Sequence, residues 1–253
     1  MERIPMAEYQ ARPGMSRSTL WRVLRSPMHA MFAKQNPQEP TGPMQLGSAT
    51  HTLTLEPHLF DREFVVADVD RRTKVGKETA AMYAGAGLTL LKPDQFAQVR
   101  GMAEAVRAHP TASALLSTGE AELSVFWTDE ATGVPCKCRP DWTREDRIIV
   151  DLKSCQDASP EGFQRAAWSS GYQMQAAFYL DAMKGKSFVF IAVESEPPHA
   201  VAVYVADDDF LFLGRSQYQQ ALKRVAECSQ TGVWPGYSDE IMTLSPPKWA
   251  LFK

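Results

Sequence analysis

The chain has 253 residues, a formal net charge of -3 at neutral pH and a hydrophobic content of 44%. This length accommodates one large domain with a substantial core, or two small ones. The negative balance argues against a wholly basic DNA-binding surface, although a basic strip beside an acidic site is compatible with it. No apolar run approaches the ~18 residues of a membrane span, and no signal peptide pattern opens the chain. We therefore expect a cytoplasmic protein that does not contact membranes.

The first 115 residues or so predict a helical arm. Ser16 is a good N-cap for a helix that ends or restarts at Ser26-Pro27. Apolar residues at helical spacing predict further helices over 46–55 and 92–109. The segments expected to be non-regular, the last of them exposed and basic, are 1–15, 35–44 and 70–77.

From residue 121 apolar and polar side chains begin to alternate, which indicates strands. We expect an antiparallel meander of three strands, with Glu122 on the first. The expected strands are 121–127, 134–139 and 147–153, followed by helices at 160–169 and 172–183, strands at 187–194 and 200–206, and a helix at 207–229. This order of helices and strands predicts one α/β domain, with its core over about 116–230. The tail, 231–253, reads as irregular and as packed through aromatic residues such as Trp249.

Asp151 and Lys153 follow an apolar run of β-branched residues. Because successive side chains of a strand point to opposite faces, these two project to the same side. Asp141 precedes them, after Arg139-Pro140. Carboxylates beside a lysine at strand ends are typical of Mg²⁺-dependent phosphodiester cleavage. An isolated Asp-x-Lys is more often a solvated pair, so this interpretation depends on its neighbours.

Other residues are candidates to complete such a site. Glu122 is a third acid, and reads equally well as a surface glutamate. His51 lies on an apolar helix, where most histidines are core residues, but beside carboxylates it becomes a candidate metal ligand. Gln175 and Tyr179 share one helix face, and an amide there is able to orient the lysine, a water or a DNA phosphate.

The four cysteines do not show a metal-binding pattern. Cys136-x-Cys138 is one residue short of the usual zinc spacing, and no second pair follows. No phosphate-binding Gly-x₄-Gly-Lys-Ser/Thr motif is present either. We expect no zinc, no iron–sulfur cluster and no ATP.

Taken together and in order, these motifs resemble the PD-(D/E)xK nuclease superfamily, and within it the exonuclease VIII (RecE-type) nuclease domain, which is related to lambda exonuclease and RecB-type nucleases. The blocks that carry the resemblance are 14–20, 46–51, 72–77, 102–110, Arg139-Pro140-Asp141-Trp142, Asp151-Leu152-Lys153 and Gln173-x-Gln175 with Tyr179. The resemblance implies a PD-(D/E)xK core, which has a central mixed five-stranded sheet flanked by helices.

The resemblance also implies an activity: an Mg²⁺-dependent exonuclease, with Mn²⁺ as an alternative, that degrades linear double-stranded DNA 5′→3′ and leaves 3′ tails for phage-type recombination. The enzyme would work with a single-strand annealing protein and would assemble as a homotrimer or homotetramer ring. It would act in a bacterial host cell that carries a phage or prophage. Two alternatives stay open. One is a repair or CRISPR-associated nuclease that acts on single strands or endonucleolytically, and the other is a catalytically silent DNA-binding scaffold.

The roles of individual residues follow from the same resemblance. Metal ligands would be His51, Asp141, Asp151 and the backbone carbonyl of Leu152. Lys153 would activate the water, Glu122 would lie at the edge of the site and Gln175 would support it. Basic residues are also candidates for phosphate contacts because of their charge, although each reads equally well as part of a solvated face. The residues expected to contact DNA are Ser16, Arg17, Arg25, Arg71, Arg72, Lys74, Lys77 and Tyr179.

Overall fold

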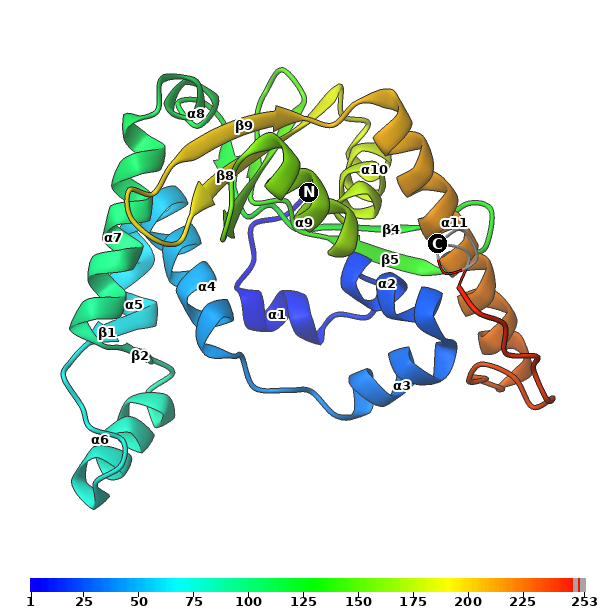
Figure 1. Ribbon diagram of the computed structural model, residues 1–253, viewed down its shortest axis with the longest axis horizontal. Coiled ribbons are helices and arrows are strands. Elements are labelled where there is room, and N and C mark those ends of the chain that lie inside the picture. The colour runs from blue at the N-terminus through cyan, green and yellow to red at the C-terminus, as the bar shows by residue number, and fades with distance from the viewer. Residues whose placement is uncertain (248–249, 251–253) are drawn as a thin grey trace.

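The computed structural model describes residues 1–247 and 250, so the expected packing of Trp249 lies outside the described residues. Helices dominate the first part of the chain (Figure 1). Its elements are α1 (Met6–Ala11), α2 (Arg17–Arg25), α3 (Pro27–Gln35), α4 (Gly42–Leu55), η1 (Pro57–Leu59), α5 (Phe60–Glu63), β1 (Phe64–Val66), α6 (Lys74–Gly85), β2 (Thr89–Leu91), α7 (Pro93–Ala108) and α8 (Pro110–Leu115). No helix within the described ranges is long and apolar enough to cross a bilayer.

The second part contains most of the strands. Its elements are β3 (Glu120–Ala121), β4 (Val125–Thr128), β5 (Pro135–Cys138), β6 (Trp142–Thr143), β7 (Ile148–Cys155), α9 (Pro160–Ser169), α10 (Tyr172–Met183), β8 (Ser187–Glu194), β9 (Val201–Val205) and α11 (Asp208–Thr231). The bounds of α9, α10 and β8 are those that the sequence predicts, because N-caps and glycines mark these elements clearly: Ser159 caps α9 and Gly171 precedes α10.

The central sheet is mixed and five-stranded, with the strand order β3-β6-β7-β8-β9, which confirms the expected α/β class. β7 and β8 run parallel and pair from Ile148↔Ser187 to Cys155↔Glu194, while β6 and β9 pair antiparallel to them. Because β7 and β8 are central and covered on both faces, none of their residues is exposed and most are fully buried.

Two hydrophobic clusters cover the two faces of this sheet. On one face Ile149 and Phe190 pack in the cluster of α10 and α11. On the other, Val150 and Leu152 pack in the cluster of α4 and α7. Residues on both sides of position 115 therefore share a core. The alternation also places Asp151 and Lys153 on the face of Ile149, toward α10.

The expected meander is wrong. β4 and β5 form a separate two-stranded sheet, and β7 pairs instead with β6 and β8. Glu122 does not lie on a strand. Its φ of 56° places it in the left-handed region, between β3 and β4, where it interrupts the alternation. β6, with two residues, is too short to show a periodic pattern.

Two helices occur where the sequence indicated irregular chain, and one begins earlier than expected. α1 buries none of its side chains, and α6 buries only Gly76, so neither shows the apolar stripe that reveals a helix. Thr73 nevertheless caps α6, since its Oγ1 accepts a hydrogen bond from Gly76 N. α4 begins at Gly42 because Pro43 is tolerated in the first turn of a helix.

Candidate metal and catalytic site

Asp151 and Lys153 form a buried ion pair on β7. The Asp151 carboxylate is fully buried; its Oδ1 accepts a hydrogen bond from Gln175 Nε2 at 2.5 Å, and its Oδ2 contacts Lys153 Nζ. Lys153 Nζ also lies 4.8 Å from the centroid of the Tyr172 ring. Gln175 and Tyr172 both belong to α10, so this helix supplies the polar and aromatic partners of the pair.

The surroundings of this pair shift both pKa values. Burial and, secondly, the nearby Asp141 carboxylate together raise the pKa of Asp151 to about 6, against the opposing effect of Lys153. Burial lowers the pKa of Lys153, but the carboxylates of Asp151 and Asp141 outweigh it, so this pKa is raised. Lys153 is therefore a charged ammonium at neutral pH, suited to donating hydrogen bonds and not to accepting a proton.

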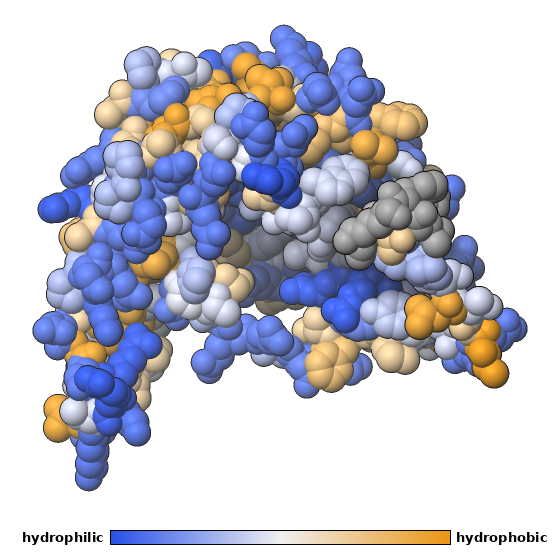
Figure 2. Space-filling model, in the orientation of Figure 1, coloured by the Kyte–Doolittle hydropathy of each residue, from blue (hydrophilic) through white to orange (hydrophobic). Residues whose placement is uncertain are grey.

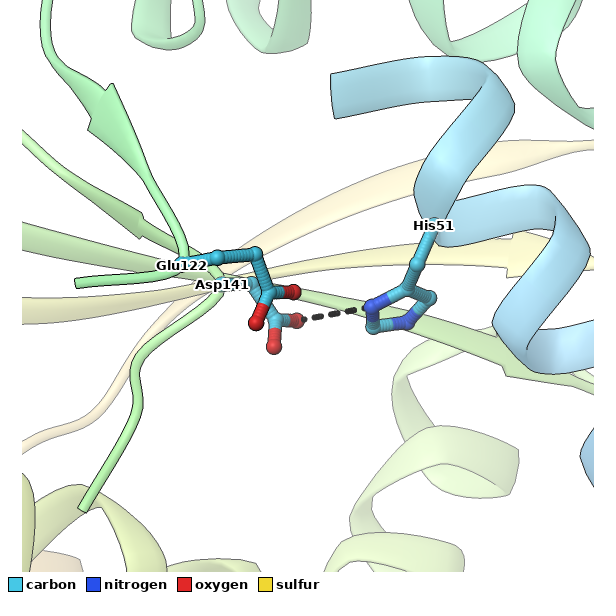
Figure 3. A group of neighbouring side chains, drawn as sticks. All are labelled: His51, Glu122 and Asp141. Carbon is cyan, nitrogen blue, oxygen red and sulfur yellow. Dashed lines mark ion pairs between the residues drawn. The ribbon is translucent and has the colours of Figure 1, made fainter. Parts of the chain in front are cut away.

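His51, Glu122 and Asp141 come together from three separate segments (Figure 3). Each offers one ligand atom, and these atoms lie within 4.8 Å of one another. The contact marked in Figure 3 joins His51 Nδ1 to Asp141 Oδ2 at 3.3 Å. His51 is carried by α4, Glu122 lies between β3 and β4, and Asp141 lies between β5 and β6. All three side chains are half-buried.

Asp141 connects this cluster to β7. Its Oδ2 accepts a hydrogen bond from the backbone N–H of Leu152 at 2.8 Å. Asp151 itself is outside the three-residue cluster, because its carboxylate oxygens are directed to Gln175 and Lys153. Ligation by Asp151 and by the Leu152 carbonyl stays a prediction.

These residues fit a divalent cation. Carboxylate oxygens are the ligands that Mg²⁺ and Mn²⁺ prefer, and an imidazole nitrogen is acceptable to Mn²⁺. The acids are also in excess locally: Asp141 raises the pKa of both Glu122 and Asp151, and Asp151 Oδ2 accepts no hydrogen bond of normal geometry. A bound cation would relieve this repulsion between like charges.

Two cavities meet at the site. One, of about 860 Å³, is lined by the metal-binding candidates and by further acids, including His51, Glu56, Glu63, Glu122 and Asp141. The other, of about 830 Å³, is lined by cations and by catalytic candidates, including Arg17, Lys34, Lys137, Lys153, Gln175 and Tyr179. Met6 and Arg139 line both. The molecule is hollowed on the face shown in Figure 2, between the α4 side and the side of α2 and α3.

The structure divides the expected DNA contacts into two groups. Ser16, Arg17 and Tyr179 line the basic cavity beside Lys153. The others do not line either cavity. Four of them contact other residues of the chain: Arg25 donates a hydrogen bond to Tyr237 and Arg71 to the Leu90 carbonyl, while Arg72 pairs with Asp70 and Lys74 with Glu78. Lys77 is on α6, which projects from the body of the molecule (Figure 1). A role for these residues in DNA binding stays a prediction.

Three cations at the site were missed as candidates: Lys34, Lys137 and Arg139. A signal for two of them was present, because Lys137 and Arg139 are separated by one residue just before Pro140-Asp141 and therefore share a strand face. Lys34 is distant in sequence from every motif and carries no such signal.

Comparisons with known proteins show the family and the fold of this chain. A family model described as "PDDEXK-like domain of unknown function (DUF3799)" matches residues 16–245. Among curated proteins the sequence finds no match. The crystal structure of a putative exonuclease from Eubacterium rectale has a TM-score of 0.69 at 14% identity, over 99% of this chain and 98% of that chain. This likeness shows a shared fold.

Two further crystal structures are more distant. An alkaline exonuclease (LHK-Exo) from Laribacter hongkongensis gives a TM-score of 0.40 at 12% identity, over 90% of this chain and 97% of that chain. A phage related exonuclease from Haemophilus somnus gives 0.41 at 10% identity, over 90% and 100%. The family match spans most of the chain and includes every residue of the site, which confirms the expected superfamily and fold. The chain therefore belongs to the PDDEXK-like family described as DUF3799.

Proposed function

We propose that the protein is a divalent-metal-dependent deoxyribonuclease that degrades linear double-stranded DNA from its 5′ ends. The observation that carries the proposal is the convergence of His51, Glu122 and Asp141 beside the Asp151–Lys153 pair. Family membership and the basic cavity adjoining the site support it. The 5′→3′ polarity, a role in phage-type recombination, an annealing partner and a ring-shaped homo-oligomer are proposed from the resemblance to exonuclease VIII.

Each residue has a role that follows from its contacts. His51, Glu122 and Asp141 would hold the ion, with the Asp151 carboxylate next to them. When bound, Mg²⁺ or Mn²⁺ supplies positive charge to the phosphate oxygens on which negative charge develops. Lys153, charged at neutral pH, donates hydrogen bonds to the attacking water or to a phosphate oxygen and stabilises developing charge. Asp151 holds the ammonium, and Gln175 holds Asp151.

The proposal is tested with linear duplex labelled at either the 5′ or the 3′ end, with and without Mg²⁺, and with closed circular DNA of the same sequence. We expect Mg²⁺-dependent release of 5′ label first and no attack on the circle. Release of 3′ label first contradicts the polarity. Cleavage of the circle favours the endonucleolytic alternative.

Asp151→Ala and Lys153→Ala test the site. Loss of one charge-stabilising group costs about 10²–10³ in kcat, so we expect at least this loss from Lys153→Ala. Lys223→Ala, an exposed lysine on α11, is the matched control and should retain full activity. Circular dichroism shows whether each variant is folded. Full activity in a folded Lys153→Ala or Asp151→Ala protein would refute the assignment.

A further inference from the structure

A segment at the N-terminus crosses the site and is attached to the protein at several points. This N-terminal strap, residues 2–15, includes α1, which lies between α4 and α2 in Figure 1. The backbone of Glu2 exchanges hydrogen bonds with that of Ser124, and Met15 pairs with the Cys136 region of β5. Arg3 forms an ion pair with Glu56 at the end of α4.

Two cations beneath the strap hold its middle. Lys137 Nζ donates to the carbonyls of Tyr9, Gln10 and Arg12 at 2.9, 3.1 and 2.6 Å, at the C-terminal end of α1. Arg139, two residues further along the chain and just after β5, donates from its terminal NH1 nitrogen to the carbonyl of Ile4 at 2.8 Å. The carbonyls at a helix end carry partial negative charge, so Lys137 is well placed to bind them.

Arg139 also reaches the candidate metal ligand Glu122. Its Nε donates to Glu122 Oε2 at 2.6 Å, and its side chain is 11% exposed. The Glu122 backbone is in the left-handed region, and its N–H donates to the Asp141 carbonyl at 3.1 Å. Glutamate rarely adopts this conformation, so these contacts compensate for its strain. One guanidinium thus contacts both the strap and a ligand.

We propose that Arg139 is a positioning residue: docking of the N-terminal strap holds Arg139, and Arg139 holds Glu122 in the orientation that binds metal. The inference rests on the proposed metal site and concerns how that site is assembled. Only arginine presents several N–H donors in a planar fork that can join the Ile4 carbonyl and the Glu122 carboxylate at once. Glu122 keeps its second oxygen, Oε1, for the ion.

The direction in which Arg139→Gln changes metal affinity distinguishes a positioning role of Arg139 from a purely electrostatic effect of its charge. Arg139 is a cation near the metal site, so removing its charge would by Coulomb's law strengthen the binding of another cation. A positioning role predicts the opposite, because loss of a residue that orients a ligand typically weakens metal affinity by about 10- to 100-fold. Arg139→Gln therefore gives opposite results under the two explanations.

The experiment is calorimetric titration of the full-length protein with Mn²⁺ alone, without DNA. We expect Arg139→Gln to weaken Mn²⁺ binding by at least about tenfold. Lys137→Met, which loosens the strap without touching Glu122, should weaken it in the same direction but less. Because both substitutions act through one chain of contacts, their combined effect should be smaller than the sum of the separate effects. Arg100→Gln, which breaks an exposed ion pair with Glu104 on α7, is the matched control and should bind as wild type does.

The outcomes separate this inference from the proposed function. Unchanged or tighter Mn²⁺ binding in Arg139→Gln, with normal binding by wild type, would overturn the inference and leave the proposed function standing. No binding by wild type would overturn both. Where Arg139→Gln does not fold, Lys137→Met decides: wild-type affinity in that variant refutes a role for the strap.

Discussion

Gln175 joins two charged residues at the centre of the site. Its Nε2 donates to Asp151 Oδ1, and its Oε1 accepts from an Arg17 terminal nitrogen at 3.0 Å. Arg17 also donates to the carbonyl of Ser170, so its guanidinium is fixed at the edge of the basic cavity. A buried amide that satisfies a carboxylate on one side and a guanidinium on the other transmits the position of α2 to β7. Individual residues here matter chiefly through the partners that they orient.

The buried acids predict a pH dependence of metal binding. Burial raises the pKa of Glu122 to about 8 and of Asp151 to about 6, each with a contribution from Asp141. The ordinary pKa values of these groups are 4.5 for Glu122 and 3.8 for Asp151. Between the ordinary and the raised pKa of each group, the folded, metal-free protein binds more protons than the unfolded chain. Its stability therefore falls as the pH rises through this window.

Metal binding reverses this effect, because ligand carboxylates must release their protons. We expect Mn²⁺ to raise the melting temperature more at pH 8 than at pH 6, as measured by differential scanning calorimetry. Asp141→Asn, which removes a proposed metal ligand, should show little Mn²⁺ effect at either pH. An equal rise at both pH values in wild type would contradict the prediction.

Among the elements, the contact between α10 and α11 positions the site from behind. Gly214 of α11 faces the backbone of α10: a Cβ atom at this position would lie 2.0 Å from the Gln173 carbonyl oxygen and 3.0 Å from Ala177 Cβ. The two helices are able to approach this closely because position 214 has no side chain. Since α10 carries Gln175 and Tyr172, its separation from α11 would displace both partners of the Asp151–Lys153 pair.

Gly214→Ala should therefore reduce stability and activity together. Overpacking of this kind typically costs about 1–3 kcal/mol in the free energy of unfolding, which urea denaturation measures. Gly85→Ala, at the end of α6, is the matched control, because beyond its own turn of helix the added Cβ meets no atom within 4 Å. Equal stability of the two variants would show that the α10–α11 contact is looser than described.

Over the whole molecule, charge is distributed unevenly. The net charge of -3 does not favour binding to DNA, yet one cavity gathers cations and its neighbour gathers acids. Binding of a polyanion then depends on a small number of local contacts beside the acidic cluster. The salt dependence of such binding is proportional to the number of phosphate contacts, because each contact releases counterions.

Lys34 provides a test of this arrangement, since it lines the basic cavity from α3 without belonging to a catalytic motif. In an Asp141→Asn background, Lys34→Ala should weaken duplex binding and reduce the slope of log affinity against log salt by about 1. Fluorescence anisotropy at several salt concentrations measures both. Lys223→Ala on the exposed face of α11 is the control. An unchanged slope in Lys34→Ala would place the DNA elsewhere.

Local patterns in the sequence were sufficient to predict several helices and strands of this protein and its superfamily. The bounds of α9, α10 and β8 follow from caps and periodicity, and the shared side of Asp151 and Lys153 follows from the period of a strand. The superfamily follows from the order of short motifs, now confirmed by the family match. These features depend on residues near one another in sequence, so a single chain is enough to reveal them.

Only the tertiary structure decided how the site is assembled. The approach of His51 to Asp141 depends on packing α4 onto the far face of the sheet, and no local pattern encodes it. Glu122 reads as a strand residue, but its left-handed backbone and its pairing with Arg139 arise where β3 passes into the separate β4–β5 sheet. The strap binds Arg139 through the carbonyl of Ile4, and every residue possesses such a carbonyl, so this contact leaves no mark in the sequence.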